Sequence, residues 1–283
     1  APRVVVVGGG PAGAAMSLLL AERGVDTTLI EREPGFDRVF RGEGLMPSGV
    51  DALFEMGLGG LMDELPTRKL EAWDLYIDGR LIMSVPEPLD ELGDRAMRII
   101  PQAAFLDAVV SKARHHSNFR FLDQTVARDL VVEIDRVCGV RVQRGDRNET
   151  IPADLVVGCD GRGSLLRTRA GLELNQLREH YDVRCFKMPA PERMRERCAM
   201  LLMPSRHSIA ACYTSWDDRL QYALMVPKGV KTAEMEGDWP ELLAAPCPDW
   251  LKPHLRTVEN EIEGPVRLNV LVGRCENWSR PGL

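Results

Sequence analysis

The sequence predicts an α/β protein in which a three-layer domain with a parallel sheet is interleaved with a smaller domain built on an antiparallel sheet. Two apolar strands with glycine-rich ends, one at Val4–Val7 and one running into Asp160-Gly161, predict the parallel sheet. Short alternating apolar runs between Tyr181 and Val226 predict the antiparallel sheet. We expect the first domain to comprise 1–67, 101–175 and the C-terminal end, 271–283, and the second to comprise 68–100 and 176–270.

Composition limits the function classes. The chain has 283 residues, 45% of them hydrophobic, and a net charge of -6, which disfavours a nucleic-acid partner. The seven cysteines and five histidines show no metal-ligand spacing, so we expect no metal, and reduced thiols in a cytoplasmic protein. No signal peptide or membrane span is predicted. The partner that we expect is a small-molecule substrate, and the oligomeric state stays open.

The first strand runs directly into a glycine loop and a helix. Gly8 lets the chain turn, Gly10 lets the backbone approach a pyrophosphate, and Gly13 lets the helix lie close to the strand. The predicted helix covers residues 12–23 and ends at Gly24. Its N-terminus offers unpaired N–H groups and a partial positive charge to phosphates.

A second strand, "DTTLIER", follows and ends at Glu31. This carboxylate lies 18 residues after Gly13, close to where an acidic residue accepts hydrogen bonds from a ribose. The spacing therefore predicts a dinucleotide site, with a βαβ unit that binds no ligand as the alternative.

The later segments predict alternating helices and strands. Ser48 is a possible cap for a helix in "SGVDALFEMGLGGLMDEL", and a hairpin turns at Asp78-Gly79. The remaining predicted elements are a helix at 101–116, strands between 119 and 158, helical stretches near 231–243 and 249–261, and a strand at 266–272.

A second motif, Asp160-Gly161-Arg162-Gly163-Ser164, ends a buried strand and precedes an arginine-rich helix. We expect it to return an acidic group and N–H donors toward the first glycine loop. With Glu31-Arg32, the Arg41-Gly42-Glu43-Gly44 loop and Pro101-Gln102, it makes the whole chain similar to the class A flavoprotein monooxygenases, the para-hydroxybenzoate hydroxylase-like family.

This resemblance implies an FAD-binding Rossmann-like domain in the first part and a substrate domain in the second. It assigns to FAD, in chain order, Gly8, Gly10, Pro11, Ala12, Gly13, Glu31, Arg32, Arg41, Gln102, Val126, Asp160 and Gly161.

The implied roles differ along the chain. The first loop would hold the pyrophosphate with help from Arg41, Glu31 the ribose, and Arg32 would lie along the adenine side. The Asp-Gly motif is associated with both FAD and reduced nicotinamide. For Gln102 and Val126, ordinary polarity at a helix start and strand packing are equally good interpretations.

The implied reaction is a hydroxylation. Family members use NADH or NADPH and O2, and a flavin hydroperoxide transfers one oxygen atom to a small, aromatic or polyketide-like substrate. Tyr213, Tyr222 and His207 are possible pocket residues, with core or surface packing as the alternative. The sequence assigns no catalytic acid or base.

The chain also departs from the family. A Gly-Asp-Ala-Ala-His motif is expected where the chain stops at "ENWSRPGL", so we expect a fragment that is inactive alone. One alternative is a flavin-dependent reductase of the geranylgeranyl type, because "QYALMVPKG" partly matches its Tyr-x-Trp-x-Phe-Pro-Lys element. Another is a non-catalytic binding protein on the FAD fold.

Overall fold

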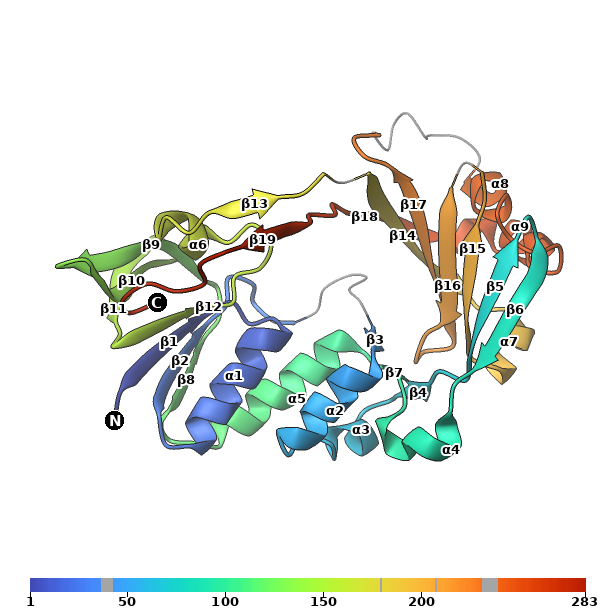
Figure 1. Ribbon diagram of the computed structural model, residues 1–283. Helices are drawn as coiled ribbons and strands as arrows, with labels where there is room; N and C mark the ends of the chain where they lie inside the picture. Colours follow the sequence, from blue (N-terminus) through green and yellow to red (C-terminus); the bar gives the residue numbers. More distant parts are fainter. Residues whose placement is uncertain (37–42, 179, 207, 231–238) are drawn as a thin grey trace. The chain divides into compact units, whose positions relative to one another are not determined.

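The computed structural model describes residues 1–36, 43–178, 180–206, 208–230 and 239–283 (Figure 1). The chain folds into two compact units. Unit 1 comprises Ala1–Asp37, Gln102–Leu177 and Leu271–Leu283; unit 2 comprises Arg38–Pro101 and Arg178–Val270. The observed boundary differs from the expected one near residue 67, because residues 43–67 belong to unit 2.

A parallel sheet forms the centre of unit 1. Among the described residues its strand order is β12-β1-β2-β8, and every pairing is parallel. The bounds are β1 Arg3–Val7, β2 Asp26–Ile30, β8 Phe119–Leu122 and β12 Leu155–Gly158. The four valines of β1 are almost fully buried, which explains the β-branched run in the sequence.

The central sheet of unit 1 is covered on both sides. Helices α1, Pro11–Glu22, and α5, Gln102–Arg114, lie next to each other in one layer (Figure 1). An antiparallel sheet of β9, β10 and β11 forms the other layer, and its Leu130 and Val140 share a core with Val5 and Val7. These strands cover Thr125–Glu133, Arg136–Arg144 and Arg147–Pro152. The predicted three-layer α/β class is confirmed.

The C-terminal residues complete unit 1. Strand β19, Gly273–Cys275, pairs with β13, Leu174–Gln176. The carbonyl of Pro281 accepts from the N–H of Val137, and the carbonyl of Gly282 accepts from the N–H of Val156. The tail therefore lies along both the parallel sheet and the antiparallel layer.

Unit 2 contains an extended sheet that we call the large sheet. In the described part of this unit its order is β18-β14-β17-β16-β15-β5-β6. Neighbours are antiparallel except β15 and β5. The bounds are β5 Ala72–Ile77, β6 Arg80–Pro86, β14 Tyr181–Pro189, β15 Ala199–Pro204, β16 Ile209–Thr214, β17 Arg219–Pro227 and β18 Glu263–Leu268.

Helices α8, Trp239–Ala244, and α9, Lys252–Thr257, cover one face of the large sheet. Their Leu243 and Leu255 share a buried core with Tyr222 of β17. The predicted helix near 249–261 is thus shorter than expected and ends in a 3₁₀ turn at Glu259–Glu261. The last strand of this sheet also begins earlier than the predicted 266.

Shorter elements complete the described chain. They are β3 Gly44–Leu45, α2 Pro47–Glu55, α3 Leu61–Glu64, β4 Arg68–Lys69, α4 Leu89–Leu92, a 3₁₀ turn at Gly93–Arg95, β7 Arg98–Ile99, α6 Leu165–Arg169 and α7 Glu192–Glu196. Ser48, a possible cap from the sequence, does not cap this helix: Pro47 takes the first helical position, so Met46 is the N-cap. The hairpin at Asp78-Gly79 is confirmed, with φ of 49° and 76°.

Candidate cofactor-binding site

The loop between β1 and α1 is packed so closely that two of its glycines cannot carry a side chain. Gly8 has φ +106°, and a Cβ there would lie 2.2 Å from the carbonyl oxygen of Cys159. A Cβ at Gly13 would lie 1.9 Å from the carbonyl oxygen of Gly8. The strand, the helix and the segment after β12 therefore meet at backbone contact.

Gly10 is different, because a Cβ on it would meet nothing within 4 Å. It is the N-cap of α1, makes no side-chain cap, and is followed by Pro11 at the first helical position. Pro11 and Ala12 are both exposed, and the first turn of α1 carries no acidic residue. Open space at an uncapped N-terminus of a helix of 12 residues fits an anionic pyrophosphate.

Glu31 follows β2 and is only 4% exposed. Its carboxylate accepts from the N–H of Gly9 at 2.7 Å and from the N–H of Glu33 at 3.0 Å. Glu31 therefore lies next to the glycine loop and also holds it through a hydrogen bond. Arg32 is exposed and pairs with Glu33 at 3.1 Å.

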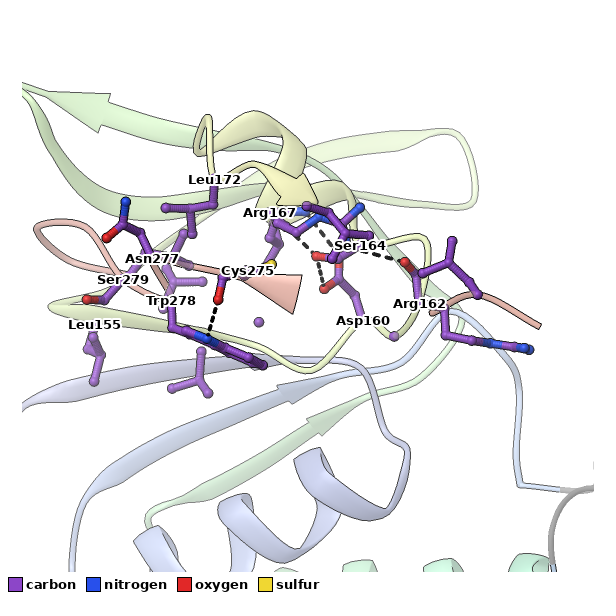
Figure 2. A pocket seen from close by; sticks show the side chains of 18 residues that line it. Leu155, Asp160, Arg162, Ser164, Arg167, Leu172, Cys275, Asn277, Trp278 and Ser279 are labelled. Carbon is purple, nitrogen blue, oxygen red and sulfur yellow. Dashed lines mark hydrogen bonds between the residues drawn. The ribbon is translucent and has the colours of Figure 1, made fainter. Parts of the chain in front are cut away.

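The Asp160-Gly161 motif lies directly against the glycine loop, as predicted. The N–H of Cys159 donates to the carbonyl of Val7 at 2.7 Å. The Asp160 carboxylate accepts from Ser164 Oγ at 2.6 Å and from the N–H of Leu166 at 3.1 Å (Figure 2). Its two oxygens thus hold the first turn of α6, while Gly161 has φ +87°.

A cavity of about 520 Å³ borders this motif (Figure 2). It lies within unit 1, between β12, α6 and the C-terminal stretch, and is mainly apolar, with Leu155, Leu172 and Trp278 among its lining residues. Arg162 and Arg167 also line it. The sequence does not reveal this cavity, because its walls come from two segments about 100 residues apart and no local pattern marks them.

The other residues assigned to FAD remain predictions. Gln102 begins α5 and Val126 lies in β9 opposite Gln143, and both are half-buried. Arg41 and His207 lie outside the described residues.

The two tyrosines proposed for the pocket lie on opposite faces of the large sheet. Tyr222 is fully buried under α8 and α9, and its hydroxyl donates to the carbonyl of Leu243 at 2.8 Å. It is therefore a core residue and not a pocket residue. Tyr213 is half-buried on the other face, where burial and then the Glu43 carboxylate raise the pKa of its hydroxyl.

A buried charged cluster, which the sequence did not reveal, lies near Tyr213. Lys187 contacts Glu43 at 3.3 Å and Asp217 at 2.8 Å. Glu43 also accepts a hydrogen bond from Ser215. Glu43 belongs to the Arg-Gly-Glu-Gly segment of the resemblance, but its partners Lys187 and Ser215 lie more than 140 residues further along the chain, so no spacing rule connects them.

The described ranges contain no cluster of three metal-ligating side chains. None of their helices combines the length and apolarity needed to cross a bilayer.

Comparison with known proteins identifies the family. The model of the FAD binding domain family matches residues 2–244. The chain belongs to this family. It is 30% identical over 292 residues to 6-methylpretetramide 4-monooxygenase of Streptomyces rimosus, covering 99% of this chain and 67% of that enzyme. Squalene monooxygenase SE2 of Panax ginseng is 32% identical over 167 residues, or 58% of this chain and 30% of that one.

Solved structures of a monooxygenase and of a hydroxylase share the fold of this chain. The p-nitrophenol 4-monooxygenase of Pseudomonas putida superposes with a TM-score of 0.85 at 18% identity, over 99% of this chain and 71% of that one. Aklavinone-11 hydroxylase, solved with FAD and aklavinone, gives 0.75 at 16% identity, over 99% and 56%. The predicted family, its monooxygenase class and its cofactor FAD are confirmed.

Proposed function

We propose that this FAD-dependent monooxygenase uses NADH or NADPH and O2 to hydroxylate a small aromatic or polyketide-like compound. The observation that carries the proposal is the glycine loop, which combines close contact at Gly8 and Gly13 with open space at Gly10. Bound FAD would supply the redox chemistry, and the protein would hold and orient it.

Each part of the loop has a proposed role. The N–H groups at the start of α1 bind the pyrophosphate, and the open side of Gly10 gives it room. Glu31 holds the loop through Gly9 and accepts from the ribose with its remaining capacity. Asp160 keeps α6 in place and so positions the Gly161 turn beside the cofactor.

The names of relatives support the substrate class. They include 6-methylpretetramide, p-nitrophenol and aklavinone. The large sheet of unit 2 is the surface that we propose for substrate binding, because its half-exposed face is apolar and carries few charges.

Gly10→Ala tests the cofactor site. The new methyl has room in the protein alone but would enter the space proposed for the pyrophosphate. We expect FAD to bind at least about tenfold more weakly, which corresponds to about 1.4 kcal/mol, with an unchanged melting temperature. Fluorescence titration of FAD and thermal unfolding of the apoprotein measure the two effects.

Gly60→Ala is the matched control. Gly60 is the N-cap of α3 in unit 2 and also has open space beside it, so neither quantity should change. An unchanged FAD dissociation constant in Gly10→Ala would contradict the proposed site. Anaerobic bleaching of bound flavin by NADH and by NADPH then identifies the reductant.

A further inference from the structure

One face of the large sheet is not covered by α8 and α9, although at one end its Tyr213 packs against the buried Leu70 and Ile99. Side chains alternate along each strand, so even-numbered residues of β14, β16 and β17 face α8 and α9. Phe186, Cys212 and Tyr222 are examples, and all three are fully buried. The odd-numbered residues face the other way, and most of them are half-exposed.

Register places the smallest of these residues together. Cys185 pairs with Ala223, and Ala223 pairs with Ala211, so three small side chains form a row across three strands. A row of larger apolar side chains lies two residues further along: Val183, Met225 and Ile209. The middle row is therefore a shallow floor with apolar side chains at one edge.

The opposite edge of the floor is polar. Lys187 pairs with Gln221, and Gln221 pairs with Tyr213. From this row to the apolar row is four residues, about 13 Å, and three strands span about 10 Å. These dimensions suit a flat, fused-ring molecule.

Gln221 carries an acceptor that the protein does not use. It is only 7% exposed, and within the described residues no group donates to its Oε1. Its neighbour Lys187 is already held by Glu43 and Asp217. A buried acceptor without a donor is costly, so this oxygen suits a hydroxyl supplied by a ligand.

The charges near this row favour a neutral donor. Lys187 faces two carboxylates, those of Glu43 and Asp217, and Arg219 is paired with Glu263 at 2.5 Å. The side chains around Gln221 thus hold no excess positive charge for an anionic substrate. A protonated hydroxyl is neutral and is not repelled by these carboxylates.

We propose that Gln221 determines substrate specificity by accepting a hydrogen bond from a phenolic hydroxyl of a flat aromatic substrate. The ring system lies over Cys185, Ala223 and Ala211, and its apolar end lies toward Met225. This inference rests on the proposed function, but it concerns residues that take no part in the FAD site.

The test compares two probes, 2,6-dihydroxyanthraquinone and its 2,6-dimethoxy analogue. The pH is kept below the pKa of the phenol groups, so that both hydroxyls stay protonated. We expect the full chain, with FAD added, to bind the dihydroxy probe at least about tenfold more tightly. In Gln221→Met this preference falls to about twofold or less, because the acceptor is gone while the volume is kept. The melting temperature stays equal or rises, since an unpaired buried oxygen is removed.

Tyr222→Phe is the matched control on the opposite face of the same strand. It loses the bond to Leu243, so its melting temperature falls while the probe preference is retained. Equal affinity of the wild type for both probes, no binding of either, or a full preference in Gln221→Met overturns the proposal. Repeating the comparison without FAD separates this result from a failure of flavin binding, which would contradict the proposed function instead.

Discussion

Glu31 shows how a single carboxylate can fix a ligand-binding loop. Its oxygens accept two backbone N–H groups, from Gly9 and Glu33, in a nearly buried position. We expect Glu31→Ala to lower the free energy of unfolding by about 1–3 kcal/mol, because both N–H groups lose their acceptor. Urea unfolding of the apoprotein measures this loss.

Arg32→Ala provides the comparison for Glu31. Arg32 is exposed and its ion pair with Glu33 lies at the surface, so we expect a change within about 0.5 kcal/mol. A Glu31→Ala protein as stable as Arg32→Ala would show that the loop holds its shape without the carboxylate.

Gly13 has no room for a side chain, whereas Gly10 has open space beside it. We expect Gly13→Ala to destabilise the apoprotein by about 1–3 kcal/mol, since its Cβ would overlap the carbonyl oxygen of Gly8. Thermal unfolding of Gly13→Ala and Gly10→Ala together measures the difference. Similar melting temperatures in the two variants would contradict the close packing described at Gly13.

At the residue scale, the sequence predicts the features of the glycine loop that depend on the spacing of nearby residues. The places of Gly8, Gly13 and Glu31 follow from turn geometry, which is encoded within a few residues. Tyr213 and Tyr222 could not be distinguished in this way. Their faces depend on which side of the sheet α8 and α9 cover, and no residue near either tyrosine records that choice.

Strand β6 is exposed at every one of its seven residues. It forms one edge of the large sheet, and Leu81, Ile82 and Met83 are at least half exposed. An exposed apolar edge strand favours pairing between molecules. We expect Ile82→Lys to reduce light scattering on heating by several fold while leaving the melting temperature nearly unchanged.

Val132→Lys serves as the control for β6. Val132 is a similarly exposed apolar residue in β9 of unit 1. If both substitutions reduce scattering equally, the effect is one of net charge, and the edge of β6 is not the site of association.

At the element scale, the residue patterns predict where strands lie better than they predict which strands pair with each other. Asp78-Gly79 predicted the β5–β6 hairpin, because both residues tolerate positive φ. The parallel pairing of β5 with β15 could not be predicted, since more than 100 residues separate them and alternation does not encode direction. Ser48 is a possible cap by residue type, but Pro47 suits the first helical position and the helix begins there.

Two buried carboxylates should make the stability of the whole molecule depend on acid. Burial alone raises the pKa of Asp182, but hydrogen bonds from Lys228 and Arg267 outweigh it and hold the pKa below its usual value. The pKa of Asp74 is also held below its usual value, because hydrogen bonds from Arg197 and Ser84 outweigh the effect of burial. Because both pKa values are lowered on folding, this stability is present above about pH 4 and is lost as pH falls.

Asp182→Asn tests this dependence. We expect a lower free energy of unfolding near neutral pH and a shallower loss between about pH 5 and pH 3, both from urea unfolding. Asp249→Asn is the control, because that carboxylate is almost fully exposed and its ion pair with Lys252 lies at the surface. An unchanged acid slope in Asp182→Asn would mean that other carboxylates govern the transition.

At the scale of the whole chain, the sequence predicts two interleaved domains, and the two compact units divide the chain differently at residues 43–67. Residues 43–67 belong to unit 2 because β3 pairs with β7, and that pairing joins them to residues near 98. Two-residue strands carry no periodic signal, so only the folded structure reveals them.

The order in which unit 1 is assembled has a consequence for biosynthesis. Strand β1 emerges from the ribosome about 150 residues before its neighbour β12, and Gly282, which binds Val156, follows about 125 residues later still. At about 5–20 residues per second, roughly 8–30 s pass before β12 has been synthesised. Throughout that time the nascent chain carries a valine strand with one edge open. An open apolar strand edge favours pairing with other chains, so we expect slower translation to lengthen the period in which this edge is exposed to such pairing.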